Sequence, residues 1–544
     1  MSARELLLRR LFPSWQALIL LLAWIFLWSL AWDNDGLWVQ GDSPRHAANG
    51  LFWKDFLLRL PLDDPQGYAL SYYARYPVIN PVTYPPGFYV AEGALYGIAG
   101  PSPYVAKGLV LAFALLGAGY TMAWLRRWID PRVGWIAALL LLLPGVVKWS
   151  HAVMLNIPAM ALVVASLYHA RRWIEAPEGS RESRHLYPAA ALSLAAILTY
   201  ATTGVVVFVI LAWILASGRA RLLWAPRTLG AGAVCALLLL PWMTVIPDWA
   251  PSHLALATPT AEQITQLSNW TYYLELLPGL FGPLVLMLST VGLAAGLASR
   301  RWRREAMFLL LWVGVCYTVF SLIVARMDRY VLVLGPALVI LSALAVLRLT
   351  ERPALAAVRQ GALVAVLLGQ AWLAWRTHIP SLTGFRELVA FIEKVAPDEP
   401  VFYDGYHDGV FSFYLQSRDP DYRRRVVLGN KVLYASAIFQ DQGLEQYVSN
   451  PREAVEALRT RTGCGWILIE RGAYTEEVPA ARWLRQAVER PELQLVRSFP
   501  ISGRGIERVD VYRLLVPHST PKTALLPFPI LGRGVHYEVK PIER

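Results

Sequence analysis

Charged residues and cysteines are both scarce in this sequence. Only 17% of the 544 residues are Asp, Glu, Lys or Arg, whereas 56% are hydrophobic. A water-soluble protein of this length needs more polar surface, so the composition excludes an ordinary soluble fold and predicts a polytopic membrane protein. The three cysteines, at 235, 316 and 464, stand far apart. This spacing excludes a disulfide framework and a cysteine-based metal site.

The hydrophobic residues form long runs separated by short polar segments. A helix needs about 20 apolar residues to cross a bilayer core, and about eleven runs approach that length. They are 14–32, 103–125, 133–148, 151–170, 187–201, 203–217, 228–247, 276–299, 305–325, 330–348 and 354–374. No small-residue cleavage site follows the first run, so we interpret it as a retained helix and not as a signal peptide.

The arginines predict how the chain is oriented. They gather before the first run and then in alternate loops, at 9–10, 126–132, 171–184, 219–227, 300–304 and 348–359. The positive-inside rule places these loops and the N-terminus in the cytoplasm. We expect the protein to lie in the inner or plasma membrane. The same clusters account for the net charge of +12, so we expect no nucleic-acid partner. Three segments then face outward: 33–102, 247–275 and the tail from 377.

The tail has a different periodicity from the rest of the chain. "FRELVAFIEKV", "EAVEALRTR" and "ARWLRQAVER" have helical patterns, whereas "PVFYDG", "GWILIER", "LQLVRSF" and "VDVYRLL" are typical of strands. This alternation predicts a small α/β domain. We therefore expect a membrane domain over 1–376, which includes the outer loop 33–102, and an extracytoplasmic α/β domain over 377–544.

Polar residues cluster at the start of the first outer loop. In "GDSPRHAANG", Pro44 suits the first helical turn and Ser43 suits the cap, with Asp42 directly before it. The helix that follows carries Arg45 and His46 on a polar side and is amphipathic, so we expect it to lie in the outer membrane interface.

Two further stretches bring polar groups toward the outer surface. "TYPPGFYVAEG" contains Tyr84 before two prolines and Glu92 within an aromatic helix pattern. "RMDRYVLVLGP" places Arg326 and Arg329 at the outer end of an apolar run, against the positive-inside trend. A cation there either extends to lipid headgroups or holds an anion.

Taken in order, these features resemble the GT-C glycosyltransferases of family 39, which include protein O-mannosyltransferases and the lipid A aminoarabinose transferase. The shared layout is an early acid in the first outer loop, interfacial helices, a "YPP" stretch, a late "RY…P" helix and an outward C-terminal domain. It extends over nearly the whole chain.

The resemblance implies transfer of a sugar from a polyprenyl-phosphate donor to a lipid, polysaccharide or protein acceptor. The protein would also contact membrane lipids. Asp42 would be the general base that takes the proton of the acceptor hydroxyl. Arg329, followed by Arg326, would neutralise the leaving phosphate. The candidates for binding substrate are Arg329, Arg326, His46, Tyr84, Glu92 and Asn156.

The sequence departs from the family pattern at two positions. Ser43 follows Asp42 where the family commonly has Glu, and Asn156 stands where members often carry a second acid near the fourth helix. Divalent metals prefer several carboxylate oxygens, so we expect no metal and no other cofactor.

Two alternatives remain open from the sequence. A transporter or flippase of a lipid-linked anion would also need cations at helix ends, but transporters usually show internal repeats, and we find none. A non-catalytic relative that binds a glycolipid is the other alternative, because the second acid is missing.

Overall fold

In the computed structural model the chain forms two compact units. The described residues are 15–31, 41–79, 84–177, 179–245, 260, 264–323, 326–349, 356–436, 444–473, 478–503, 505–518, 523–528 and 533–538. We name the units after their predicted locations: the membrane unit comprises Met1–Trp32 and Lys107–Ile379, and the outer unit comprises Asp33–Ala106 and Pro380–Arg544. The boundary near 379 lies close to the expected one. The loop 33–102, which we expected to group with the membrane part, instead makes its compact contacts with the C-terminal part.

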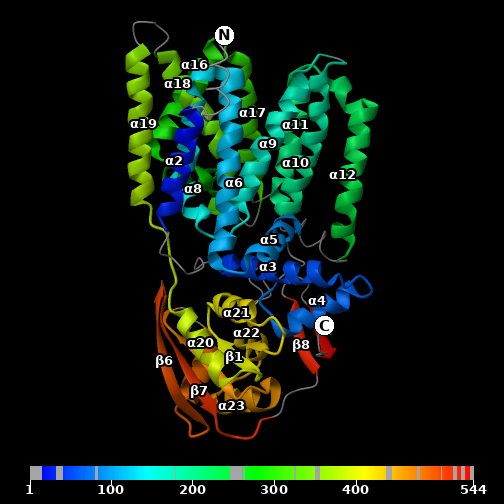
Figure 1. Ribbon diagram of the computed structural model, residues 1–544, viewed down its shortest axis with the longest axis vertical. Coiled ribbons are helices and arrows are strands. Elements are labelled where there is room, and N and C mark those ends of the chain that lie inside the picture. The colour runs from blue at the N-terminus through cyan, green and yellow to red at the C-terminus, as the bar shows by residue number, and fades with distance from the viewer. Residues whose placement is uncertain are drawn as a thin grey trace. The chain divides into compact units, whose positions relative to one another are not determined.

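Helices make up the described part of the membrane unit (Figure 1). They are α2 (Trp15–Ser29), α6 (Pro103–Trp124), η1 (Leu125–Ile129), η2 (Pro131–Ala137), α7 (Ala138–Leu141), α8 (Pro144–Ser150), α9 (Asn156–Glu175), η3 (Arg181–His185), α10 (Leu186–Thr199), η4 (Ala201–Gly204), α11 (Val205–Ala216), η5 (Ala220–Trp224), α12 (Pro226–Val245), α15 (Leu267–Phe281), α16 (Pro283–Ala298), α17 (Arg303–Leu322), η6 (Asp328–Leu334), α18 (Gly335–Leu349) and α19 (Ala356–Arg376).

Each predicted apolar run corresponds to helical structure. Within the described residues, four helices are long and apolar enough to cross a membrane, and two bent pairs bring the number to six. The count of about eleven crossings therefore stays a prediction. The predicted cytoplasmic arginines at 9–10 and most of the outer loop 247–275 lie outside the described residues.

The two bent pairs show how the fold keeps backbone groups satisfied inside an apolar bundle. The axis turns by 58° between α7 and α8, before Pro144, and by 113° between α15 and α16, at Gly282. Gly282 has φ +83°, a left-handed conformation that favours glycine. The buried Gln370 of α19 donates its side-chain amide to the carbonyl oxygens of Leu142 and Phe281, both at 3.3 Å. One side chain thus binds carbonyls that the two breaks release.

One arginine of the predicted cytoplasmic clusters is a core residue. Arg171 is 2% exposed and forms an ion pair with Glu305 of α17. The Trp124 indole of α6 donates to the same carboxylate at 2.7 Å. The Arg171 guanidinium also lies 4.4 Å from the Trp128 ring centroid. Arg171 therefore joins three helices. The sequence analysis counted it with the loop arginines that indicate topology and did not reveal this role.

The outer unit contains both helices and strands. Its elements are α3 (Asp42–Arg59), α4 (Pro65–Arg75), α5 (Gly87–Ala99), α20 (Phe385–Val395), β1 (Val401–Asp404), α21 (Asp408–Ser417), β2 (Val426–Leu428), α22 (Gly429–Val432), β3 (Tyr434–Ser436), β4 (Leu444–Gln446), α23 (Pro451–Ala457), η8 (Leu458–Thr462), β5 (Trp466–Arg471), α24 (Pro479–Ala487), β6 (Leu493–Gly503), β7 (Ile506–Leu514), β8 (Thr523–Phe528) and β9 (Arg533–Glu538).

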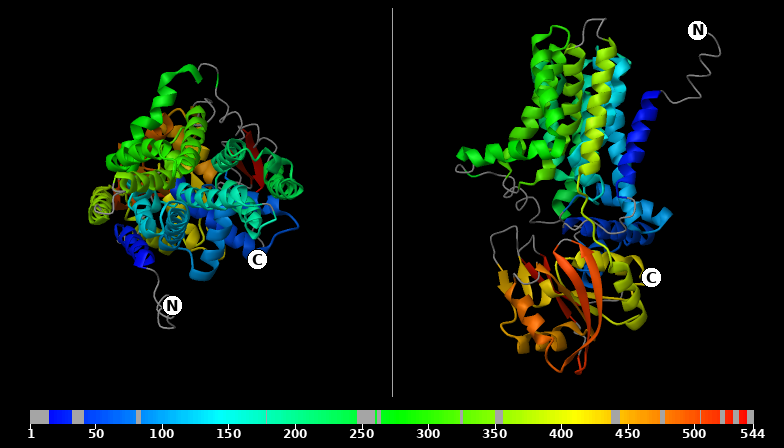
Figure 2. Two further views of the ribbon diagram at one scale, coloured as in Figure 1. Left: turned by 90° about the horizontal axis from the view of Figure 1, so that it is seen from above. Right: turned by 90° about the vertical axis from the view of Figure 1, so that its left-hand side faces the viewer.

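A five-stranded mixed sheet with the order β2-β1-β5-β7-β6 organises the C-terminal part. Strand β1 is parallel to β2 and β5, whereas β7 is antiparallel to β5 and to β6. Figure 2 shows β6 and β7 as a long, twisted pair of orange strands. The predicted strands and helices of the tail are confirmed, and with them the α/β class.

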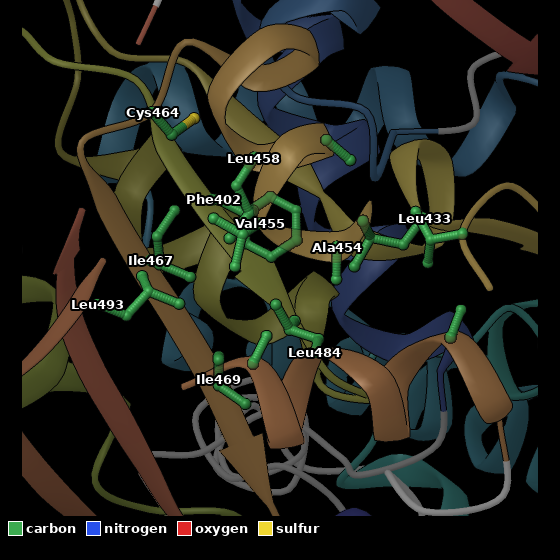
Figure 3. Packing of buried hydrophobic residues seen from close by; sticks show 14 of the residues in the cluster. Phe402, Leu433, Ala454, Val455, Leu458, Cys464, Ile467, Ile469, Leu484 and Leu493 are labelled. Carbon is green, nitrogen blue, oxygen red and sulfur yellow. The ribbon is translucent and has the colours of Figure 1, made fainter. Parts of the chain in front are cut away.

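One hydrophobic core of this domain lies on the side of the sheet that α23, η8 and α24 cover. Phe402, Ile467 and Ile469 of the central strands pack against side chains from α23, η8 and α24, among them Val455 and Leu484 (Figure 3). These residues are less than 7% exposed. The alternation of strands and amphipathic helices in the sequence arises from this packing.

Candidate functional site

The helix α3 begins at Asp42, two residues before the expected start at Pro44. Gly41 occupies the cap position, and Asp42 is the acidic residue of the first turn. Ser43, which we expected as the cap, lies inside the helix and is fully buried. A carboxylate in the first turn is stabilised by the helix dipole. Asp42 is partly exposed at the helix end.

Helices α3 and α5 approach each other closely through glycines. A Cβ atom at Gly50 would overlap the Glu92 carboxylate, and one at Gly93 would lie 2.6 Å from the backbone nitrogen of Lys54. Only residues without a side chain permit this separation. The consequence is that side chains from one helix reach those of the other directly.

His46 lies among tyrosines that this close packing brings together. Its Nδ1 is 2.6 Å from the Tyr89 hydroxyl, and its ring centroid is 4.9 Å from that of Tyr84. His46 is 2% exposed. Burial raises the pKa of Tyr89 well above its ordinary value, so Tyr89 keeps its proton. The structure therefore brings His46 and Tyr84 together and adds Tyr89, which the sequence reasoning did not single out.

Glu92 is also in this part of the chain, but its side chain is fully buried. Its Oε1 accepts a hydrogen bond of 3.3 Å from Tyr96, and within the described residues its Oε2 has no hydrogen-bond partner. Burial raises the pKa of Glu92 well above its ordinary value, which keeps the carboxyl neutral. With no exposed atom, Glu92 is a core residue of the α3–α5 contact in this arrangement.

Arg45, one turn after Asp42, contacts the C-terminal part of the outer unit. Its Nη2 lies 3.4 Å from Asp408 Oδ1 at the start of α21. Asp408 also accepts a 3.0 Å hydrogen bond from Asn430. The charge of Asp408, followed by that of Asp42, raises the pKa of Arg45, although burial opposes this. Asp408 was not predicted. The only signal was its position after the strand "PVFYDG", at the carboxyl end of β1, where α/β sheets commonly place functional residues.

The predicted cations of the membrane unit lie around η6, which packs against α9. Arg329 is 6% exposed, and its guanidinium carbon lies 5.4 Å from the Trp149 ring centroid. Arg326 lies 5.3 Å from the ring centroid of Tyr272. Between them, Asp328 lies 3.4 Å from Lys148 Nζ. The arrangement is a group of three cations and one carboxylate bordered by aromatic rings.

Asn156 is the first residue of α9 and is 3% exposed. The structure thus places Asp42, His46, Tyr84 and Glu92 in the outer unit, and Arg326, Arg329 and Asn156 in the membrane unit. Among the described residues, His, Cys, Asp and Glu form no group of three that could hold a metal ion. Independence from a divalent metal stays a prediction.

Solved structures provide the comparison, since no protein-family model and no curated protein matches the sequence. ArnT from Cupriavidus metallidurans, solved with undecaprenyl phosphate bound, is 17% identical. Its match has a TM-score of 0.64 and covers 93% of this chain and 99% of that one.

Two other glycosyltransferases are similar over much of this chain. The oligosaccharyltransferase AglB from Archaeoglobus fulgidus, in complex with an inhibitory peptide and a dolichol-phosphate, is 12% identical, with a TM-score of 0.54 over 84% of this chain and 69% of that one. The arabinofuranosyltransferase AftD from Mycobacteria is 15% identical, with a TM-score of 0.54 over 94% of this chain and 40% of that one. The chain therefore has the GT-C fold of these membrane glycosyltransferases.

Proposed function

We propose that this protein is an inverting glycosyltransferase that acts on the outer face of the inner or plasma membrane, with its N-terminus in the cytoplasm. It would move a sugar from a polyprenyl-phosphate donor to an acceptor hydroxyl. The main support is the match with ArnT, which extends over nearly the full length of both chains and whose structure contains undecaprenyl phosphate. Assignment to family 39 rests on the sequence motifs and is part of the proposal.

In the proposed reaction, the acceptor oxygen attacks the anomeric carbon of the donor sugar. The bond from that carbon to the phosphate oxygen breaks, and polyprenyl phosphate leaves with the electron pair. The acceptor proton passes to the Asp42 carboxylate, the base at the exposed start of α3. A single displacement inverts the anomeric centre. His46, with Tyr84 and Tyr89 beside it, is the proposed sugar or acceptor contact.

The leaving group gains negative charge as the bond breaks, so cations must face it. We assign this role first to Arg329. Its low exposure and its position over the Trp149 ring differ from those of an arginine that extends to lipid headgroups. Arg326 is the second candidate, and Asn156, buried at the start of α9, is a candidate polar contact. Lys148 already has Asp328 as an ion-pair partner.

The experiment compares wild type with Asp42→Asn in detergent. A panel of radiolabelled undecaprenyl-phosphate pentoses and hexoses is incubated with protein and a membrane lipid extract, and release of undecaprenyl phosphate is measured. Removing a general base costs about 10²–10⁴-fold in rate. Folding should be nearly unchanged, because a first-turn carboxylate contributes only about 0.3–1 kcal/mol. Asp63→Asn, at an exposed position of the same segment, is the matched control. Full turnover by Asp42→Asn would exclude it as the base.

A transporter of a lipid-linked anion is the second candidate. The two bent helix pairs favour it, since transporters often build their sites from interrupted helices. Reconstituted vesicles distinguish the two functions. Movement of labelled undecaprenyl-phosphate sugar between leaflets with the sugar–phosphate bond intact would support transport, and cleavage of that bond would support transfer.

A further inference from the structure

The helix α21 and the residues just after it contact the first outer segment, residues 41–79, at several points. Asp408 contacts Arg45 at one end. Farther along, Gln416 donates a 2.6 Å hydrogen bond to the Tyr72 hydroxyl, and Asp419 accepts one from the Tyr76 hydroxyl. All these residues belong to the outer unit. They are separated by more than 300 residues in sequence, so the contacts join two distant parts of the chain.

The polar groups of α21 are buried where they make these contacts. Asp408 is 3% exposed, Gln416 is 6% exposed and Asp419 is 5% exposed. Removing a partner from a buried polar group is costly. The contacts with the first outer segment therefore add to the bond that Asp408 accepts from Asn430 and to those that Asp419 accepts from the backbone amides of Arg423 and Arg424. Tyr72 extends the network, because its hydroxyl also donates to Asp55 of α3 at 2.7 Å. The contacts therefore fix one arrangement of α21 on α3 and α4.

At the start of α21 the backbone approaches α3 directly. A Cβ atom at Gly409 would lie 2.9 Å from Pro44 Cγ and 3.3 Å from Pro44 Cβ. The proline ring is rigid and cannot move aside as a flexible side chain would. The first turns of α21 and α3 are thus held at a separation that only glycine permits. Pro44 and Arg45 lie two and three residues after Asp42.

We infer that α21 positions the Asp42 carboxylate, through the Asp408–Arg45 ion pair and the Gly409–Pro44 contact. The inference rests on the proposed function, in which Asp42 is the base. The α/β domain is then a required part of the catalytic machinery and not only a separate module that binds acceptor. Asp408 is a positioning residue. It acts on Asp42 through Arg45, with which it forms an ion pair.

Two variants perturb this contact by different means. Asp408→Asn removes the charge that faces Arg45, and Gly409→Ala pushes the first turns apart without changing any charge. The control is Arg418→Gln, because Arg418 follows α21, is partly exposed and pairs with Glu393 of α20. Hydrogen exchange of the amides of 46–50 measures the order of α3 without any substrate. Steady-state kinetics with the undecaprenyl-phosphate sugar that wild type uses measures kcat and KM.

We expect both variants to exchange faster at 46–50 by about 10-fold, since local opening sets the exchange rate. We also expect kcat to fall by about 10- to 100-fold with KM nearly unchanged, because a small misplacement of a catalytic group has this effect. Arg418→Gln should match wild type in both measurements. In an Arg45→Ala background, Asp408→Asn should lower kcat no further, because the two residues act as one pair.

Unchanged exchange in both variants would overturn the inference. So would unchanged kcat in variants whose α3 exchanges faster, provided that Asp42→Asn is inactive. Failure of the proposed function is a separate result. It would appear as full turnover of Asp42→Asn or as no transfer by wild type, whereas the exchange measurement reports on α21 and α3 in either case.

Discussion

Replacement of Arg329 by Lys distinguishes a phosphate site from an arginine that only reaches for lipid headgroups. Arg329 is 6% exposed, and its guanidinium carbon lies 5.4 Å from the Trp149 ring centroid. A planar guanidinium stacks on an aromatic ring and donates two parallel hydrogen bonds to a phosphate, whereas an ammonium is a point charge. An arginine whose charge only extends to the membrane surface could be replaced by Lys without loss, because both have long stems.

The size of the expected effect follows from the bond that Lys cannot reproduce. A hydrogen bond to a charged group contributes about 1.5–3 kcal/mol, which corresponds to about 10- to 100-fold in turnover. Arg329→Lys should fall in that range, and Arg329→Ala should lose more. Arg326→Lys should be milder, because Arg326 is less buried and lies over Tyr272.

The assay is steady-state kinetics on detergent-purified variants at fixed ionic strength, with the lipid-linked donor varied. The amount of folded protein after size-exclusion chromatography is the control. Equal activity of wild type, Arg329→Lys and Arg326→Lys would refute the phosphate assignment. The site would then have to be sought at Lys148 or at the buried Lys107.

Three further predictions concern the packing that holds the site. Gly93→Ala should lower the free energy of unfolding by about 1–3 kcal/mol, since its Cβ would meet the backbone of α3. In the control Gly97→Ala, on the same helix, the Cβ meets nothing within 4 Å, so thermal unfolding should show a loss of stability for Gly93→Ala alone. Glu92→Gln should gain stability relative to wild type as pH rises above about 4.5, because the carboxyl of the unfolded chain then ionises while burial, which raises the pKa of Glu92, keeps the folded carboxyl protonated. A stability difference that is constant from pH 5 to 8 would contradict this. Gln370→Leu should lower the apparent melting temperature, since two buried carbonyls lose a donor at about 1–3 kcal/mol each; an unchanged melting temperature would show that other groups satisfy them.

The sequence was most informative where packing follows periodicity. The helix "FRELVAFIEKV" coincides with α20, and the patterns of the tail located β1, β5, β6 and β7. Each of these elements buries one face or lies inside the sheet, so hydrophobic spacing reports it directly. The apolar runs of the membrane unit were located equally well for the same reason.

Breaks and long-range contacts were not predictable by the same means. The run 276–299 was predicted as one apolar stretch, and its 113° bend depends on the conformation of Gly282 and on a donor from α19, a helix distant in sequence. The segment "DGVFSFYLQS" mixes polar and hydrophobic residues without a helical stripe, because α21 is buried on most sides. The pairing of Asp408 with Arg45 depends on how the two parts of the outer unit fold together.

The missing second carboxylate fits the local structure of the site. Position 43, where the family that the sequence resembles commonly has Glu, is fully buried within α3, so a carboxylate there would be removed from water and costly to keep charged. Asn156 is likewise 3% exposed at the start of α9. A single displacement needs one base, and Asp42 alone remains partly exposed at a helix start beside Arg45. Neutral residues at 43 and 156 therefore leave the proposed proton transfer intact.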